Sequence, residues 1–176
     1  MTVKSISLLP LVAILLLAVA PARAADQGTV QAVIPWEGEG RIFQIDSRRI
    51  QFLGAIEGIM YVENAKGEMN EAFVQCPIIQ MMDLESGTTE AFGHCEITAS
   101  PDDVVYAQLS CKGRVGDCTG KFILIDGEGK FAGISGEGML RVRSPIHALA
   151  GDLGSGALLR VAAGLAVIRD LKFSTP

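Results

Sequence analysis

Apolar and polar residues alternate with a period of two along several segments after residue 25, which is the pattern of β-strands that bury one face. The longest such run lies at residues 50–62, where Gln51 and Glu57 occupy odd positions, and Glu63 follows in the same phase. Its even positions are Ile50, Phe52, Gly54, Ile56, Gly58, Met60 and Val62. We therefore expect a strand whose even-numbered side chains face the core.

Turn signals divide the rest of the chain into further short strands. Residues 71–82 and 88–99 form an expected hairpin, in which His94 lies on the solvent face opposite to that of Cys95. A first strand or arm at residues 29–34 is expected to end at Pro35 and the glycine-rich stretch after it. Other strands are expected at residues 41–46, 105–111, 119–125 and 139–144.

The C-terminal segment, residues 157–173, is the one place where a helix competes with a strand. From residue 165 onward the apolar residues Leu165, Val167, Leu171 and Phe173 fall on odd positions. This alternation predicts a closing strand with those four side chains on one face, after a loop at residues 144–156.

The count of eight to ten short strands, with no convincing helix after residue 25, predicts an all-β fold, an antiparallel barrel or sandwich. Closure into a barrel would remove the sheet edges. It would leave an interior that is filled by side chains or encloses one small ligand.

The first 24 residues have the organisation of a secretory signal peptide. Lys4 precedes an apolar run at residues 6–20, and Ala22 and Ala24 are small residues at the positions that a signal peptidase reads. A membrane anchor is disfavoured because the run is shorter than the roughly 20 residues needed to cross a bilayer. We expect cleavage after Ala24 or Ala25, export to the periplasm or secretion, and a single domain at residues 25–176 that does not insert into a membrane.

Charge then limits the partners of the exported domain. The chain has 15 basic and 20 acidic residues, and removal of Lys4 and Arg23 with the signal leaves 13 basic residues against 20 acidic ones. This negative balance argues against binding to nucleic acid or to anionic membrane surfaces.

Four cysteines, Cys76, Cys95, Cys111 and Cys118, lie in the exported part and predict two disulfides. Four cysteines allow three connectivities. The hairpin positions favour Cys76 with Cys95 and Cys111 with Cys118. A metal site that includes His94 is disfavoured, because no two cysteines have the close spacing of a zinc site.

Glycine is concentrated between residues 127 and 138. The pattern is Gly127, Gly129, Phe131, Gly133, Ser135, Gly136 and Gly138. We interpret it as structural, with glycines that let a strand curve and with Phe131 entering the core. A phosphate-binding loop is excluded because no helix is expected after Gly138.

This glycine pattern resembles the signature of allene oxide cyclase-like and dirigent-like proteins, and the chain also looks like small exported bacterial proteins of unassigned function. The resemblance implies a single eight-stranded antiparallel β-barrel. It also implies that a cofactor-free cyclase or isomerase is one possible activity.

Candidate chemistry is sparse. Neither His94 nor His147 stands near a serine in a recognisable catalytic arrangement. Glu57 and Tyr61 are the first candidates for an ionisable or hydrogen-bonding ligand-binding residue inside the barrel, although Glu57 also fits a wet outer face. Trp36, Tyr61 and Tyr106 are the candidate pocket aromatics.

The sequence therefore favours a non-enzymatic exported barrel protein, a binding or accessory protein that holds a small, mostly apolar ligand and uses no cofactor or metal. The alternatives are a cyclase or isomerase of the allene oxide cyclase type and a ligand-free protein-interaction module.

Overall fold

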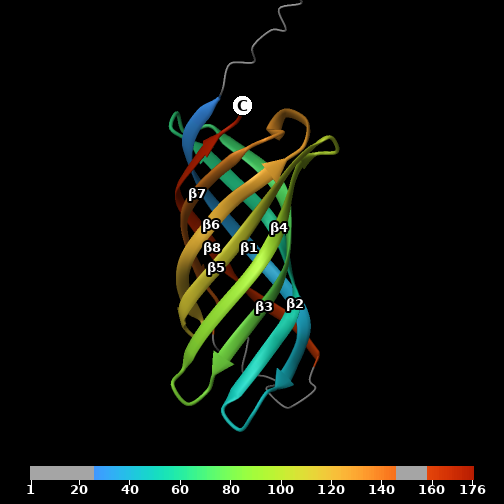
Figure 1. Ribbon diagram of the computed structural model, residues 1–176, viewed down its shortest axis with the longest axis vertical. Coiled ribbons are helices and arrows are strands. Elements are labelled where there is room, and N and C mark those ends of the chain that lie inside the picture. The colour runs from blue at the N-terminus through green and yellow to red at the C-terminus, as the bar shows by residue number, and fades with distance from the viewer. Residues whose placement is uncertain (1–25, 146–157) are drawn as a thin grey trace, which may run out of the picture.

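The computed structural model describes residues 26–145 and 158–176, which form one closed antiparallel β-barrel (Figure 1). Consecutive strands are paired, and the last strand pairs with the first. The strands are β1 (Gln27–Gln44), β2 (Arg49–Asn64), β3 (Met69–Asp83), β4 (Thr88–Ser100), β5 (Asp103–Arg114), β6 (Asp117–Gly127), β7 (Ser135–Arg143) and β8 (Leu158–Ser174). The predicted signal peptide, residues 1–24, lies outside the described residues, as do residues 146–156 of the predicted loop.

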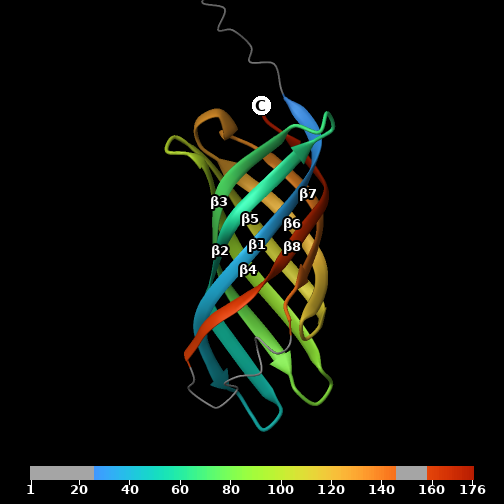
Figure 2. The same cartoon turned by 180° about the vertical axis from the view of Figure 1, so that it is seen from behind.

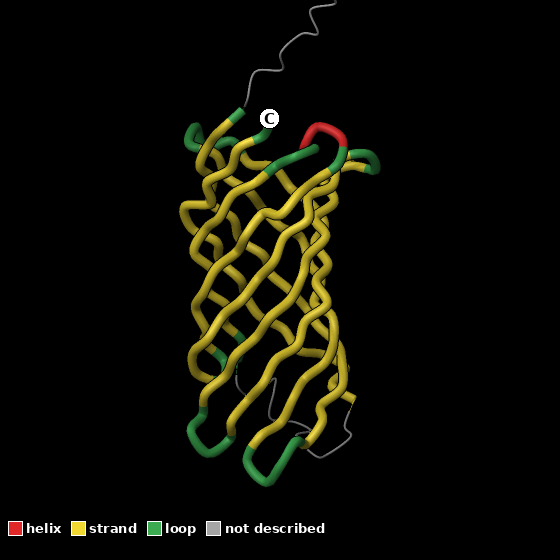
Figure 3. The backbone as a smooth tube through the Cα atoms, in the orientation of Figure 1, coloured by secondary structure: helices red, strands yellow, loops and turns green. Residues whose placement is uncertain are grey.

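The all-β, antiparallel, eight-stranded fold is confirmed, and the helical turn η1 (Gly129–Phe131) lies at one end of the barrel (Figure 3). We call the end with the β1–β2, β3–β4 and β5–β6 turns the lower end, because it lies at the bottom of Figure 1. The view from behind shows β1 beside β8, where the barrel closes (Figure 2).

The alternation predicted for residues 50–62 is confirmed in β2. Ile50, Phe52 and Met60 are buried, whereas Leu53 and Glu57 are exposed. The same alternation holds around the barrel, so that inward-facing apolar side chains make one continuous core. The hairpin of β3 and β4 also agrees with the sequence-based prediction.

The prediction that the first strand ends at Pro35 is wrong, because β1 continues to Gln44. The ladder between β1 and β2 has no pairs at Ile34 and Pro35, although its register is the same on both sides of them, whereas Pro35 is paired with Leu165 of β8. A proline lacks only its own N–H, so one ladder can accommodate it while the other remains continuous.

The strand predicted at the C-terminus is present, but its predicted phase is wrong over the first half. Leu165 is 39 % exposed, whereas Ile168 is fully buried. The register shifts between Ile168 and Leu171, where Asp170 adopts φ 50° and exchanges hydrogen bonds with the Gln31 side chain. Before this irregularity the even-numbered side chains face the core, and after it the odd-numbered ones do, so Leu171 is buried as predicted.

The glycine motif connects β6 to β7 through η1 at the upper end. Gly129 has φ 63°, and a side chain there would collide with the carbonyl oxygen of Asp102. Only glycine fits this close, left-handed position. Phe131 is partly buried and packs against the core.

Both disulfides have the favoured connectivity. Cys76–Cys95 joins β3 to β4, and Cys111–Cys118 joins β5 to β6. All four cysteines are buried inside the barrel. The two bonds are consistent with an oxidising, exported environment.

Removing either disulfide should destabilise the barrel, and the longer loop should matter more. The bonds span 19 and 7 residues, so loss of chain entropy in the unfolded state predicts losses of about 3 kcal/mol for C76A/C95A and about 2 kcal/mol for C111A/C118A. Urea unfolding of the two double variants measures these losses. If both variants were as stable as the parent, the result would contradict a stabilising role for the two disulfides.

Asp103 should make the stability of the upper end depend on pH. The Lys130 backbone N–H, the Lys130 ammonium and the Ser100 hydroxyl lower the pKa of Asp103 to about 2. A lowered pKa in the folded state stabilises the protein above pH 4, and this contribution is lost as the pH falls toward 2. Thermal unfolding of Asp103→Asn should therefore show a weaker pH dependence in this range than the parent.

Asp102→Asn is the matched control, because the neighbouring Asp102 side chain has no hydrogen bond or ion pair among residues 26–145 and 158–176. It should keep the pH profile of the parent. Identical profiles for Asp103→Asn and the parent would show that the Lys130 contacts do not stabilise the fold.

Candidate functional site

The lower half of the barrel encloses an apolar cavity of about 90 Å³. Its wall consists of inward-facing side chains from all eight strands, among them Ile42, Phe52, Ala91, Leu109, Phe122 and Leu140. By contrast, Met60, Ile97, Ala107, Ile134 and Leu171 are buried in the core but do not line the cavity. The barrel is thus filled toward its upper end and hollow toward its lower end.

Gly116 and Ser144 lie at the lower margin of the cavity. The backbone N–H of Ser144 donates to the carbonyl oxygen of Gly116 at 3.0 Å. The Ser144 hydroxyl donates to the carbonyl oxygen of Ala163 at 2.7 Å. These contacts connect the β5–β6 turn with the end of β7 and with β8. They hold the rim of the cavity in place.

Trp36 of β1 lines the cavity and is only 8 % exposed. Its neighbours in register are Gly58 of β2 and Gly164 of β8, which leave room for the indole. A Cβ atom at Gly164 would lie 2.5 Å from Cζ2 of Trp36. The Nε1–H group of Trp36 is buried without a hydrogen-bond acceptor in the part of the chain that the structure describes.

Gln80 and Thr89 form the polar part of the cavity wall. The Gln80 side chain donates to Oγ1 of Thr89 at 2.8 Å, and Thr89 donates to the carbonyl oxygen of Met81 at 2.9 Å. The sequence analysis did not single out this pair. The signal was available, because Thr89 shares the inward-facing phase of Ala91 in the predicted hairpin.

Glu57 and Tyr61 lie on the outward-facing phase of β2 and are exposed. Glu57 adjoins the cavity wall at its place in the strand, but it is aligned with the equally exposed Glu37 of β1. The structure therefore does not bring these two candidates together inside the barrel. Of the candidate aromatics, Trp36 reaches the cavity, whereas Tyr106 donates from outside to Glu128 at 2.7 Å.

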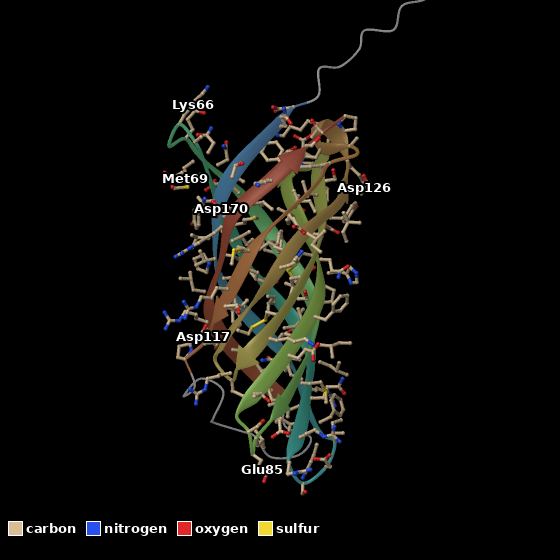
Figure 4. All side chains as sticks on the ribbon, turned by 60° about the vertical axis from the view of Figure 1, so that its left-hand side comes forward. Lys66, Met69, Glu85, Asp117, Asp126 and Asp170 are labelled. Atoms are coloured by element: carbon tan, nitrogen blue, oxygen red, sulfur yellow. A yellow bond between two sulfur atoms is a disulfide. The ribbon has the colours of Figure 1, made fainter. Side chains whose placement is uncertain are left out.

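Groups with shifted pKa values lie at the turns and on the outer surface, as Asp117 does in Figure 4. Arg141 donates two hydrogen bonds to Asp117, at 2.9 and 2.7 Å, which lower the pKa of Asp117 and raise that of Arg141. The hydrogen bond with Glu128 raises the pKa of Tyr106. The polar side chains of Gln80, Thr89, Ser144 and Trp36 on the cavity wall, in contrast, are a neutral amide, two hydroxyls and an indole.

The outer surface of β2, β3 and β4 carries a row of exposed apolar side chains. Leu53, Ile79 and Phe92 are aligned across the three strands and are each at least 40 % exposed. His94 packs its ring edge-on against Phe92, with ring centroids 5.0 Å apart. His94 therefore belongs to this outer face, as its phase in the sequence predicts.

Within residues 26–145 and 158–176, no three His, Cys, Asp or Glu residues are grouped in a way that would hold a metal ion. No helix in the same residues has the length and apolarity to cross a membrane.

In comparisons with known proteins, no protein family, no curated protein and no solved structure matches this chain.

Gly164→Ala should displace the indole from the cavity wall. The new methyl group would overlap the carbonyl oxygen of Arg143 and the ring of Trp36, so overpacking should lower the free energy of unfolding by about 1–3 kcal/mol. Urea unfolding measures this loss. The emission spectrum of Trp36, the one tryptophan in the chain, should shift as well.

Gly28→Ala is the control, because its Cβ would meet only the side chain of Phe173, at 2.9 Å, near the upper end. Its Trp36 emission should be that of the parent. An unchanged emission spectrum for Gly164→Ala would refute the close packing of the indole on β8.

Proposed function

We propose that this protein is an exported, non-enzymatic barrel protein that binds a small, mostly apolar molecule in the lower half of its interior. The observation that carries the proposal is the apolar cavity of about 90 Å³. Protein interiors are normally packed with few voids larger than a water molecule. A void of this size in a barrel closed by eight strands and two disulfides supports a binding role.

The cavity limits the size and affinity of the ligand. An apolar cavity of about 150 Å³ in another protein holds benzene, so this smaller space suits a molecule no larger than benzene. The best small ligands gain about 1.5 kcal/mol per non-hydrogen atom, which for about six atoms corresponds to a Kd of about 0.3 μM at best. Binding at this level suits a carrier or sensor of an abundant small molecule.

Export is the second part of the proposal. The apolar run at residues 6–20, followed by the small residues Ala22 and Ala24, supports a cleaved signal peptide, and the two disulfides agree with an oxidising destination. Charged side chains such as Glu57 and Lys121 on the outward-facing strand positions support a mature protein surrounded by water rather than inserted in a membrane.

We further propose that the barrel is of the allene oxide cyclase and dirigent type. The closed eight-stranded topology and the glycine signature between β6 and β7 support this relation. A cyclase activity is the weaker alternative, because its first candidates, Glu57 and Tyr61, are exposed on the outer face.

A ligand-free protein-interaction module is the second candidate function. The exposed row of Leu53, Ile79 and Phe92 favours it, since exposed apolar side chains that are contiguous often mark a contact surface. The two functions differ in whether the interior takes up a small apolar molecule.

Filling the cavity should abolish binding without unfolding the protein. Ala91 lines the cavity from β4, and leucine at this position would occupy part of the space. We expect Ala91→Leu to weaken the binding of cyclopentane by at least about tenfold, with unchanged or increased stability. Titration of the parent and the variant, followed by Trp36 fluorescence and calorimetry, measures both affinities.

Ala107→Leu is the matched control, because Ala107 is 1 % exposed in the core but does not line the cavity. It should keep the affinity for cyclopentane and lose about 1–3 kcal/mol of stability through overpacking. If the parent does not bind cyclopentane, and Ala91→Leu is destabilised as much as Ala107→Leu, the interior is filled and the interaction module becomes the better account.

A further inference from the structure

We propose, building on the ligand-binding function above, that the Trp36 Nε1–H group selects a small neutral molecule with an apolar body and one carbonyl-type acceptor. Trp36 combines two properties that are seldom found together. It lines the cavity, and its polar hydrogen is buried without an acceptor among the described residues.

The Nε1–H donor of Trp36 has no acceptor among residues 26–145 and 158–176. Buried polar groups nearly always have a hydrogen-bond partner, and leaving one unsatisfied costs on the order of 1–3 kcal/mol. Trp36 is only 8 % exposed, so bulk water does not supply the acceptor. An indole N–H donates only, so the partner must be an acceptor.

The wall of the cavity determines the charge of the ligand. Its polar side chains Gln80 and Thr89 are neutral and bonded to each other, and Thr89 also donates to Met81. The Ser144 hydroxyl at the lower margin is neutral too and donates to Ala163. The acidic residue at its lower rim, Asp117, is paired with Arg141 on the outside. A carboxylate or an amine inside would lack a counter-charge, which is a large penalty in an apolar space. A neutral molecule has no such penalty.

The surroundings of the indole favour an organic acceptor over water. A buried water molecule is held by two to four polar partners. The positions in register with Trp36 are Gly58 and Gly164, and nearby wall residues such as Ile34 and Ala166 are apolar. A carbonyl group on an apolar body accepts from the indole and fills the apolar space at the same time.

Two isosteric probes test this selectivity directly. Cyclopentanone and methylenecyclopentane have the same shape, but only the ketone carries an acceptor oxygen. We expect the protein to bind cyclopentanone about tenfold more tightly, the effect of one hydrogen bond in a buried site. Because the chain has 1 tryptophan, its single indole ¹H–¹⁵N resonance should move downfield with the ketone and not with the hydrocarbon.

Trp36→Phe removes the donor and should bind both probes equally, whereas Tyr106→Phe, which removes a donor outside the cavity, should keep the preference. If Trp36→Phe does not fold, the indole resonance of the parent decides between the outcomes. Equal binding of both probes by the parent, or a preference retained by Trp36→Phe, overturns the role of Trp36 and leaves the apolar binding function intact. Binding of neither probe contradicts the binding function itself, and the selectivity with it.

Discussion

Pairing of β1 with β8 is the constraint on which the rest of the structure depends. It closes the sheet, so every strand has two neighbours and no edge is left open. Once the sheet is closed, alternation along each strand sends one set of side chains into a shared interior and the other set to the surface. The glycines at Gly58 and Gly164, beside Trp36, then make room for the indole within this interior.

The hollow lower half follows from the sizes of the side chains at facing positions. The cavity wall combines large side chains such as Phe52 and Phe122 with the small side chains of Ala91, Ala162 and Ala166, which leave space between them. Cys76 and Cys111 also lie on this wall, so both disulfides brace the strands around the empty space. An unfilled cavity lowers the free energy of unfolding, and the two disulfides offset part of this loss.

Local pattern was sufficient to predict much of this fold. Alternation placed β2 and the β3–β4 hairpin, and hairpin positions gave the connectivity of Cys76–Cys95 and Cys111–Cys118. The continuation of β1 through Pro35 depends on β8, which is distant in sequence, and the phase of β8 depends on the irregularity at Asp170. The cavity was beyond prediction for the same reason, because its volume depends on side chains that meet from eight strands.

Xenon binding is the most direct test of a hollow, apolar interior. Xenon enters dry apolar cavities without needing a hydrogen bond, so it tests the space independently of any ligand chemistry. Crystals of the protein exposed to xenon under pressure should show one xenon site inside the lower half, in contact with Phe52, Ala91 and Leu109. The absence of xenon from the interior, with side chains in contact across that region, would contradict the account.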